Sequence, residues 1–271
     1  MKKIIIQLIC PDQKGIIAQL TSILYQSDNN ILSIEQHVDQ ENSKFYIRIF
    51  AENNDTQFPE NELAELSDEL EGKLYLFDPD KKINVAILGT TEEEPIYDLL
   101  IKNKSDELNC NFPIIISNHN ELSSIAKQFD ISFIHINDNK NLLQTLKQQK
   151  IELIILARYM QIIPKEIVKL YNNNIINIHH GFLPAFKGAR PYHQAYNKGV
   201  KIIGATAHYV TNELDDGPII AQNVIHINHK NSIKNIIQLG REIERNVLYK
   251  AVKSHLEYKI IVHNNKTIIF D

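Results

Sequence analysis

Short apolar runs alternate with helical segments through most of the chain after residue 82, and this alternation limits the fold more than any other feature. Strands and helices that follow one another in this way are typical of an open, mainly parallel, Rossmann-like sheet. The pattern then predicts a further strand at 218–227, a long amphipathic helix at 232–258 and a closing hairpin. The sheet strands are expected at 83–88, 113–117, 131–136, 152–157, 175–178 and 201–209, and the hairpin strands at 259–262 and 267–270.

Residues 1–80 follow a different order of elements. Apolar residues recur at helical spacing from Ile16 to a stop at Asn29-Asn30, and again at 61–70. With strands between them, this βαββαβ order predicts a small ferredoxin-like domain, suited to ligand binding at an interface. A polar, Pro-containing linker follows, so we expect an α/β protein with one domain at 1–80 and a second at 81–271. The strands of the first domain are expected at 4–10, 31–38, 44–50 and 73–77.

Composition excludes several classes of function. With 271 residues, 43% of them apolar, the chain can bury a real core. Its net charge of -4 and pI near 6.3 give no general attraction to nucleic acid or to an anionic membrane, and no local basic patch stands out. No window approaches the ~18 consecutive apolar residues of a membrane-spanning helix. Cys10 and Cys110 are isolated, as a reducing compartment allows, so we expect a cytoplasmic protein.

The segment 175–184 reads as a buried strand that stops at a Gly/Pro loop. Side chains two apart on a strand point to the same face, so Asn177 and His179 project together. Ligands of open parallel sheets lie beyond the carboxyl ends of the strands, which makes this pair a candidate reaction site. A later loop, 212–218, can bring Asp215 to the pair.

An amide, an imidazole and a carboxylate together suit acyl transfer. Asn177 can donate to a developing oxyanion, His179 can exchange a proton near neutral pH, and Asp215 can orient the imidazole or a water. Taken singly, the three could instead tie down a loop, satisfy an interface and form a turn, but the joint motif favours catalysis. His180 falls on the opposite face of the strand without Cys or His partners, so we expect no metal.

These residues resemble the signature of the folate-dependent formyltransferase and hydrolase superfamily, which pairs Asn-x-His before Leu-Pro with a later Leu-Asp-x-Gly-Pro. Within it, the segments 175–186, 188–196, 199–209 and 214–220 are similar to the formyltetrahydrofolate deformylase family. Gly181 departs from the family pattern, in which Ser follows the His-His pair. The resemblance implies hydrolysis of 10-formyltetrahydrofolate to formate and tetrahydrofolate, with no cofactor besides this substrate. It also implies that the product formate supplies purine synthesis and that the reaction balances one-carbon folate pools.

The resemblance further implies roles for individual residues. Asn177 would bind the formyl oxygen, His179 would donate to it or carry a proton of the water, and Asp215 would act as base or orient the water. His208 matches a superfamily histidine and would support Asp215, although a structural histidine is at least as common. Further candidates for substrate binding are Gly217 and the run Arg158, Tyr159 and Met160, where the superfamily contacts the pterin ring through its backbone. Arg190 could meet an anion or form a surface salt bridge.

Related transferases define the alternatives. Glycinamide ribonucleotide formyltransferases place a glycine-rich phosphate loop where this chain has Gly89 followed by Glu92-Glu93-Glu94. Carboxylates there complement a helix N-terminus and repel a phosphate, which disfavours a phosphorylated acceptor. A methionyl-tRNA formyltransferase is disfavoured because no basic domain for tRNA follows the long helix. The remaining alternatives are a formyltransferase acting on an unphosphorylated amine and a non-catalytic amino-acid or folate sensor.

The segment 10–18 resembles the ACT regulatory domain. Gly15 allows a tight turn from strand to helix and leaves backbone N–H groups open to the carboxylate of a small ligand. Asp12, Gly15 and Ile16 are therefore candidate effector-binding residues; the plain alternative is that Gly15 is only a turn residue. The resemblance implies glycine or methionine as effector. It also implies that ACT domains pair side by side in a homo-oligomer such as a tetramer.

Overall fold

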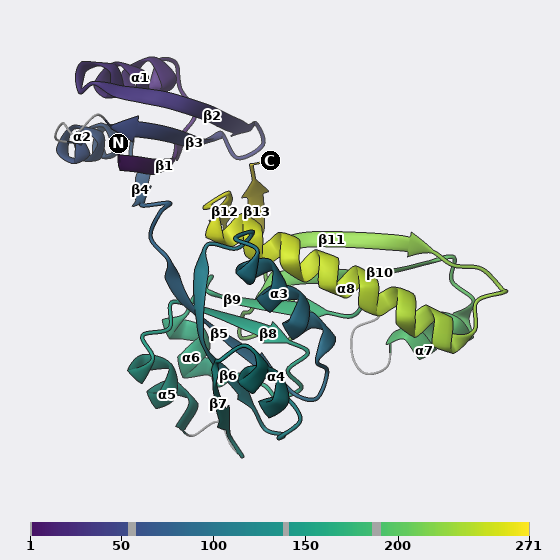
Figure 1. Ribbon diagram of the computed structural model, residues 1–271. Helices are drawn as coiled ribbons and strands as arrows, with labels where there is room; N and C mark the ends of the chain where they lie inside the picture. Colours follow the sequence, from purple (N-terminus) through teal and green to yellow (C-terminus); the bar gives the residue numbers. More distant parts are fainter. Residues whose placement is uncertain (1, 54–57, 138–140, 186–190, 271) are drawn as a thin grey trace. The chain divides into compact units, whose positions relative to one another are not determined.

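The computed structural model describes residues 2–53, 58–137, 141–185 and 191–270 (Figure 1). The chain forms two compact units, the first comprising Met1–Lys81 with Glu257–His263 and Ile268–Asp271, the second Lys82–Leu256 with Asn264–Thr267. The expected domain at 81–271 differs from the second unit at its end, because most residues after the long helix belong to the first unit.

The first unit is an antiparallel four-stranded sheet in the order β2-β3-β1-β4, which confirms the predicted ferredoxin-like fold. β1 and β3 pair along their whole length, from Lys2 opposite Asn53 to Pro11 opposite Lys44. One face of the sheet and the two helices share an apolar core that includes Ile6, Leu8 and Leu20. The elements are β1 (Lys2–Pro11), α1 (Ile16–Gln26), β2 (Asn29–Asp39), β3 (Lys44–Asn53), α2 (Glu60–Glu69) and β4 (Lys73–Phe77).

The first helix ends earlier than predicted. α1 stops at Gln26, and the left-handed residue Asp28, with φ 55°, turns the chain directly into β2. The N–H of Asp28 bonds to the carbonyl of Tyr25, which closes the last helical turn. The expected stop at Asn29-Asn30 was late because both asparagines already belong to the strand.

The other face of the first sheet binds the C-terminal residues. Gln7 and Arg48 face each other across β1 and β3, and both are buried. Arg48 Nε donates to the carbonyl of Tyr258 at 2.9 Å, and Gln7 Nε2 donates to the same carbonyl at 2.8 Å. Ile261 and Phe270 pack against Tyr46 on this face. These contacts explain why the predicted closing hairpin, β12 (Ile260–His263) with β13 (Lys266–Ile269), lies largely in the first unit.

The second unit contains a seven-stranded sheet in the order β11-β10-β9-β8-β5-β6-β7. The strands from β9 to β7 run parallel, and β10 runs antiparallel to both of its neighbours. This mixed, mostly parallel sheet confirms the predicted fold class. Its strands are β5 (Ile83–Gly89), β6 (Cys110–Ser117), β7 (Ser132–His135), β8 (Leu153–Ala157), β9 (Ile175–His179), β10 (Ile202–Tyr209) and β11 (Ile219–His226).

Strand order reverses beside β5, since β6 and β7 lie on one side of it and β8 and β9 on the other. The carboxyl ends of such strands border the crevice in which open α/β sheets bind ligands. Figure 1 shows α8 running alongside α3, and α8 also packs across β9, β10 and β11. The helices of this unit are α3 (Glu94–Lys104), α4 (Ser123–Gln128), α5 (Leu142–Gln148), α6 (Lys165–Leu170), α7 (Pro191–Lys198) and α8 (Ile233–Leu256).

Candidate functional site

Asn177 and His179 lie at the carboxyl end of β9, where the buried parallel strand meets its antiparallel neighbour β10. In that pairing His208 lies directly opposite Asn177. The Nδ2 of Asn177 is 3.2 Å from the Nε2 of His208. The β9–β10 register, which the strand pattern alone does not specify, therefore adds a histidine to the amide and imidazole predicted for this position.

The loop after β10 brings Asp215 to the same place. Asp215 has a left-handed backbone, with φ 53°, and its side chain is 12% exposed. One carboxylate oxygen, Oδ2, lies 3.3 Å from Nδ1 of His179, and the other, Oδ1, lies 3.8 Å from Nε2 of His208. The hydrogen bond from His179 is the largest cause that holds the pKa of Asp215 well below its usual range, although burial opposes this shift. The predicted trio thus meets at one point, with an ionised carboxylate between two imidazoles.

The backbone determines the tautomer of His208. Its Nδ1 lies 2.9 Å from the carbonyl oxygen of Tyr209, and only an N–H can bond to a carbonyl. In the neutral ring Nε2 is then an acceptor, which receives a hydrogen from Nδ2 of Asn177. The second hydrogen on Nδ2 of Asn177 is not used in this bond. His208 therefore orients Asn177 as well as contacting Asp215.

His179 presents one ring nitrogen to Asp215 and leaves the other without a partner. Its side chain is buried, 5% exposed, and Nε2 forms no hydrogen bond with any residue in the described part of the chain. A buried polar atom in this condition costs about 1–3 kcal/mol, which a native protein rarely tolerates without a ligand or water. A carboxylate at Nδ1 and a free Nε2 form the arrangement that proton transfer requires.

Arg158, Tyr159 and Met160 follow β8 as predicted, but the arginine side chain has its own partner. Arg158 is left-handed, with φ 61°, and its Nη1 lies 3.0 and 3.2 Å from the two carboxylate oxygens of Glu244 on α8. Tyr159 is buried, while Met160 is 59% exposed and its N–H donates to Thr90 Oγ1 at 3.0 Å. The guanidinium of Arg158 is thus occupied by an ion pair. Arg190, the other predicted anion contact, lies outside the described residues.

Sequence reasoning missed Glu244 and Tyr192. Glu244 is 3% exposed, and the Tyr192 hydroxyl donates to it at 2.5 Å. Burial outweighs the attraction of Arg158 and raises the pKa of Glu244. A signal was present, because Glu244 interrupts a stripe of buried positions at helical spacing along α8 that includes Gly240 and Val247.

His180 lies beside this cluster rather than in the trio. Its ring centre is 5.4 Å from that of His179 and 6.1 Å from that of Tyr192. Burial, followed by the nearby Arg158 charge, lowers the pKa of His180 to about 4, so the ring is neutral near pH 7. Across the described ranges, no group of three or more His, Cys, Asp or Glu residues is arranged to hold a metal ion.

The predicted acidic run after β5 is partly neutralised. Glu92 lies 3.0 Å from Nη2 of Arg241 and 3.9 Å from Nη2 of Arg158, and Glu94 lies 3.5 Å from Nη1 of Arg241. These carboxylates were expected to complement the start of α3 and to repel a phosphate. They also contact Arg158 and Arg241.

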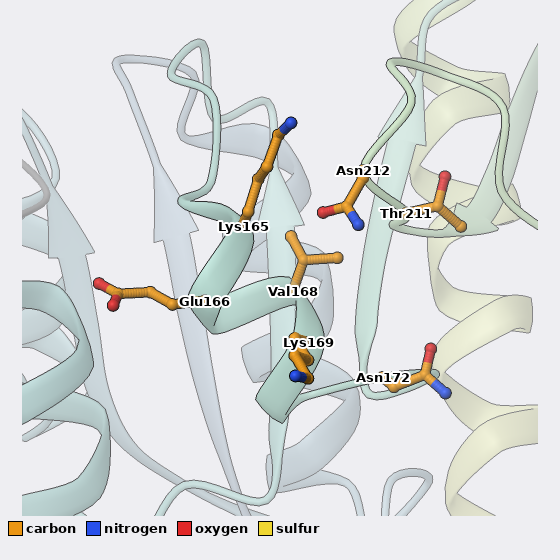
Figure 2. Close-up of a pocket in the computed structure, with 7 residues that line it drawn as sticks. All are labelled: Lys165, Glu166, Val168, Lys169, Asn172, Thr211 and Asn212. Atoms are coloured by element: carbon orange, nitrogen blue, oxygen red, sulfur yellow. The ribbon is translucent and has the colours of Figure 1, made fainter.

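A pocket of about 520 Å³ lies between α6 and the loop that leads to Asp215. Figure 2 shows the Asn212 amide pointing toward Val168, with Lys165 above it and the Glu166 carboxylate turned away. Its lining residues are Lys165, Glu166, Val168, Lys169, Asn172, Thr211 and Asn212. A ligand in this pocket would therefore contact the segment that carries Asp215.

Comparison with known proteins identifies the family. The formyl transferase family matches residues 82–252, and the ACT domain matches residues 4–71. The formyltetrahydrofolate deformylase of Synechocystis sp. (strain ATCC 27184 / PCC 6803 / Kazusa) is 41% identical, and the alignment covers 96% of each chain. The chain belongs to the formyltetrahydrofolate deformylase family. The enzyme of that name from Escherichia coli (strain K12) is 40% identical over 99% of each chain.

A solved structure agrees with this assignment. The crystal structure of a formyltetrahydrofolate deformylase from Pseudomonas syringae pv. tomato str. DC3000 matches with a TM-score of 0.96 and 36% identity, covering 100% of this chain and 95% of that chain. The deformylase family predicted from the Asn-x-His and Leu-Asp-x-Gly-Pro motifs is thereby confirmed, together with the ACT domain. In addition, no helix among the described residues has the length and apolar character needed to span a membrane.

Gly217 is required by close packing in the Asp215 loop. A Cβ at this position would lie 1.8 Å from the carbonyl oxygen of Tyr209, a backbone atom that cannot move aside easily. We expect Gly217→Ala to lower the free energy of unfolding by about 1–3 kcal/mol, as overpacked positions do. Thermal unfolding of this variant and of Glu213→Ala, an exposed change in the same loop, tests the prediction. Equal melting temperatures for Gly217→Ala and the wild type would contradict it.

Proposed function

We propose that the second unit hydrolyses 10-formyltetrahydrofolate to formate and tetrahydrofolate through Asn177, His179 and Asp215. As a member of the formyltetrahydrofolate deformylase family, the protein is a hydrolase that acts on 10-formyltetrahydrofolate. The observation that carries the residue assignment is the state of His179. Its Nδ1 lies 3.3 Å from Asp215, while its buried Nε2 has no partner within the described residues.

The proposed reaction begins with the formyl group in the crevice. The N–H of Asn177 that His208 does not receive binds the formyl oxygen. A water molecule attacks the formyl carbon while Nε2 of His179 takes one of its protons, and Asp215 stabilises the resulting imidazolium through Nδ1–H. The developing negative charge on the formyl oxygen is held by the Asn177 amide.

Collapse of this tetrahedral intermediate breaks the bond between the formyl carbon and N10 of the folate. The proton held on Nε2 of His179 passes to N10, so the leaving nitrogen departs as a neutral amine. The formic acid that forms loses its remaining proton to the solvent, so formate and tetrahydrofolate are the products, and His179 returns to its starting state. Each of the three residues thus has one task in both halves of the reaction.

Water is favoured over a phosphorylated amine as acceptor because Arg158 and Arg241, among the described residues, are already paired with carboxylates. Arg241 contacts Glu92 and Glu94, and Arg158 contacts the buried Glu244. A phosphate monoester arriving there would have to displace a carboxylate that is part of the chain. The second candidate, transfer to an unphosphorylated amine, is not opposed by these ion pairs.

Formate release tests the proposal against its alternatives. The purified protein, given 10-formyltetrahydrofolate and no amine, should release formate and tetrahydrofolate in equal amounts. A formyltransferase would release product only after an amine is added, and a non-catalytic sensor would release none. Either of these two outcomes would overturn the proposal.

We also propose that the first unit is an effector-binding module and that the effector is an amino acid such as glycine or methionine. The match of residues 4–71 to the ACT domain supports the binding of a small-molecule ligand. The proposed contacts are Asp12, Gly15 and Ile16. The sheet order leaves β2 and β4 as edge strands, which supports side-by-side pairing in a homo-oligomer. Cys10 and Cys110 are unpaired, as expected in the cytoplasm, where the formate would enter purine synthesis and the reaction would balance one-carbon folate pools.

Gly15→Val should abolish the response to the effector while basal hydrolysis persists. Gly15 has φ 94°, a conformation that β-branched residues rarely adopt, and it immediately precedes α1. Valine would therefore shift the first backbone N–H groups of the helix. The measurement is formate release titrated with glycine and with methionine.

Gly199→Val is the matched control for this experiment. Gly199 also has a positive φ, 61°, but lies in the second unit with open space around it. It should retain the wild-type response. Identical titrations for Gly15→Val and the wild type, or no response in the wild type, would mean that the first unit has a structural role instead.

A further inference from the structure

Two side chains of the C-terminal hairpin form hydrogen bonds with the loop that carries Asp215. The Nδ2 of Asn265 donates to the carbonyl oxygen of Asp216 at 3.1 Å, and the Oγ1 of Thr267 donates to the carbonyl oxygen of Ile219 at 2.5 Å. Both acceptors are backbone atoms, and they lie on either side of the Gly217-Pro218 pair. We propose that Asn265 and Thr267 are positioning residues, which hold Asp215 against His179. This inference rests on the role proposed above for Asp215.

The loop needs such support because its backbone adopts an unfavourable conformation at Asp215 and packs closely at Gly217. Asp215 is left-handed, and Gly217 packs so closely on Tyr209 that it has no room for a side chain. The N–H of Tyr209 bonds to the carbonyl of Pro218 at 2.9 Å, which anchors the loop to β10. The hairpin bonds hold the outer side of the same segment. Together these contacts determine how far the Asp215 carboxylate reaches toward His179.

The side chains of Thr267 and Asn265 lie outside the core, so each can be replaced without disturbing core packing. Asn265 is exposed and Thr267 is half-buried, and each donates a hydrogen bond to a main-chain carbonyl. The effect of removing either one should therefore appear in the geometry of the loop rather than in the packing of the unit. A displacement of about 1 Å at a reacting group can reduce a rate by roughly 10²-fold.

The residues just before the same hairpin are held in the first unit. Arg48 donates to the carbonyls of Tyr258 and Glu257 at 2.9 and 3.0 Å, and Gln7 donates to that of Tyr258 at 2.8 Å. Residues Asn264–Thr267, which are the turn and the start of β13, belong to the second unit. The chain therefore passes directly from residues of the first unit, at His263, to the residues that contact the Asp215 loop.

Kinetics of hairpin variants test this inference. Thr267→Val keeps the shape of the side chain and removes the hydroxyl, and Asn265→Ala removes the amide. Each should lower kcat roughly tenfold, with KM for 10-formyltetrahydrofolate within about twofold of the wild type and the melting temperature nearly unchanged. Thr267→Ser retains the hydroxyl and should restore kcat. Thr21→Val, which removes a threonine bond to the Ile17 carbonyl in α1, is the matched control and should behave as the wild type.

A measurement independent of activity separates this inference from the proposed function. Amide hydrogen exchange in residues 210–219 should be faster in Thr267→Val and Asn265→Ala than in the wild type, with no change in β9. If the wild type releases no formate but the exchange still increases, the proposed function fails and the hairpin still holds the loop. Unchanged exchange, unchanged kcat in both variants, or a Thr267→Ser enzyme as impaired as Thr267→Val would overturn the inference.

Discussion

Asn177→Ala and His179→Ala will each lower the turnover of 10-formyltetrahydrofolate at least roughly a hundredfold while the protein remains folded. Asn177 supplies the proposed donor to the formyl oxygen, and the loss of one such donor typically costs roughly 10²–10³ in rate. His179 supplies the only proposed path for a proton between the water and the leaving nitrogen. Formate release, measured beside thermal unfolding, gives both readouts.

We expect both variants to fold because the pairing of β9 with its neighbours, which the sequence did not reveal, does not depend on these side chains. His179 lies at a strand end, as expected, but it is buried, 4% exposed, rather than open to the crevice. The protein should tolerate the loss of this buried side chain because main-chain pairing with β8 and β10 holds β9 on both sides. Asn174→Ala, just before β9, serves as control, since the variant keeps the main-chain hydrogen bonds of Asn174 and removes only a side-chain bond to the nearby Asn172 carbonyl. Near-wild-type turnover in either Asn177→Ala or His179→Ala would contradict the assignment.

Asp215→Asn should remove hydrolysis more completely than Asp216→Asn. The Asp215 carboxylate faces His179 and His208, and its lowered pKa keeps it ionised across the neutral range. Asparagine preserves the shape but removes the charge that stabilises the imidazolium, so folate binding should persist while turnover is lost. Asp216 is exposed and offers its backbone carbonyl to Asn265. Turnover numbers of the two variants, together with folate binding by fluorescence titration, provide the comparison.

The opposite ranking of these two variants would be informative. If Asp216→Asn proved the more damaging change, the carboxylate that acts in catalysis would be the neighbour of the one that contacts His179. The hydrogen bond from Asn265 would then hold the catalytic residue directly. Equal losses in the two variants would indicate that the loop requires both charges.

The pairing of Asn177 with His179 was predictable from local rules, whereas Asp215 was found through the Leu-Asp-x-Gly-Pro motif. Alternation along a strand places Asn177 and His179 on one face, and the crevice rule for parallel sheets places that face beside a ligand. His208 required one more step, because only the register of β10 against β9 puts it opposite Asn177. Register in a mixed sheet depends on the turn and on packing, which a single sequence does not reveal.

Contacts between distant segments were the ones that sequence reasoning could not reach. Glu244 was visible as a carboxylate on a buried helical stripe, but its partners Arg158 and Tyr192 come from two other elements. The hairpin was expected as a closing element, yet nothing in its alternating pattern indicates that Arg48 binds the carbonyls of Glu257 and Tyr258 just before it. Periodicity indicates which face of an element is buried, but it does not indicate which other segment covers that face.

Hydrolysis in water labelled with ¹⁸O tests the central claim most directly. If water is the acceptor at the Asn177–His179–Asp215 site, the formate released from 10-formyltetrahydrofolate will carry one ¹⁸O atom beside the original formyl oxygen. Mass spectrometry of the formate should show this label in the wild type, and its rate of appearance should fall at least roughly a hundredfold in His179→Ala. Label appearing at the wild-type rate in His179→Ala, or formate that appears only when an amine is present, would contradict the account.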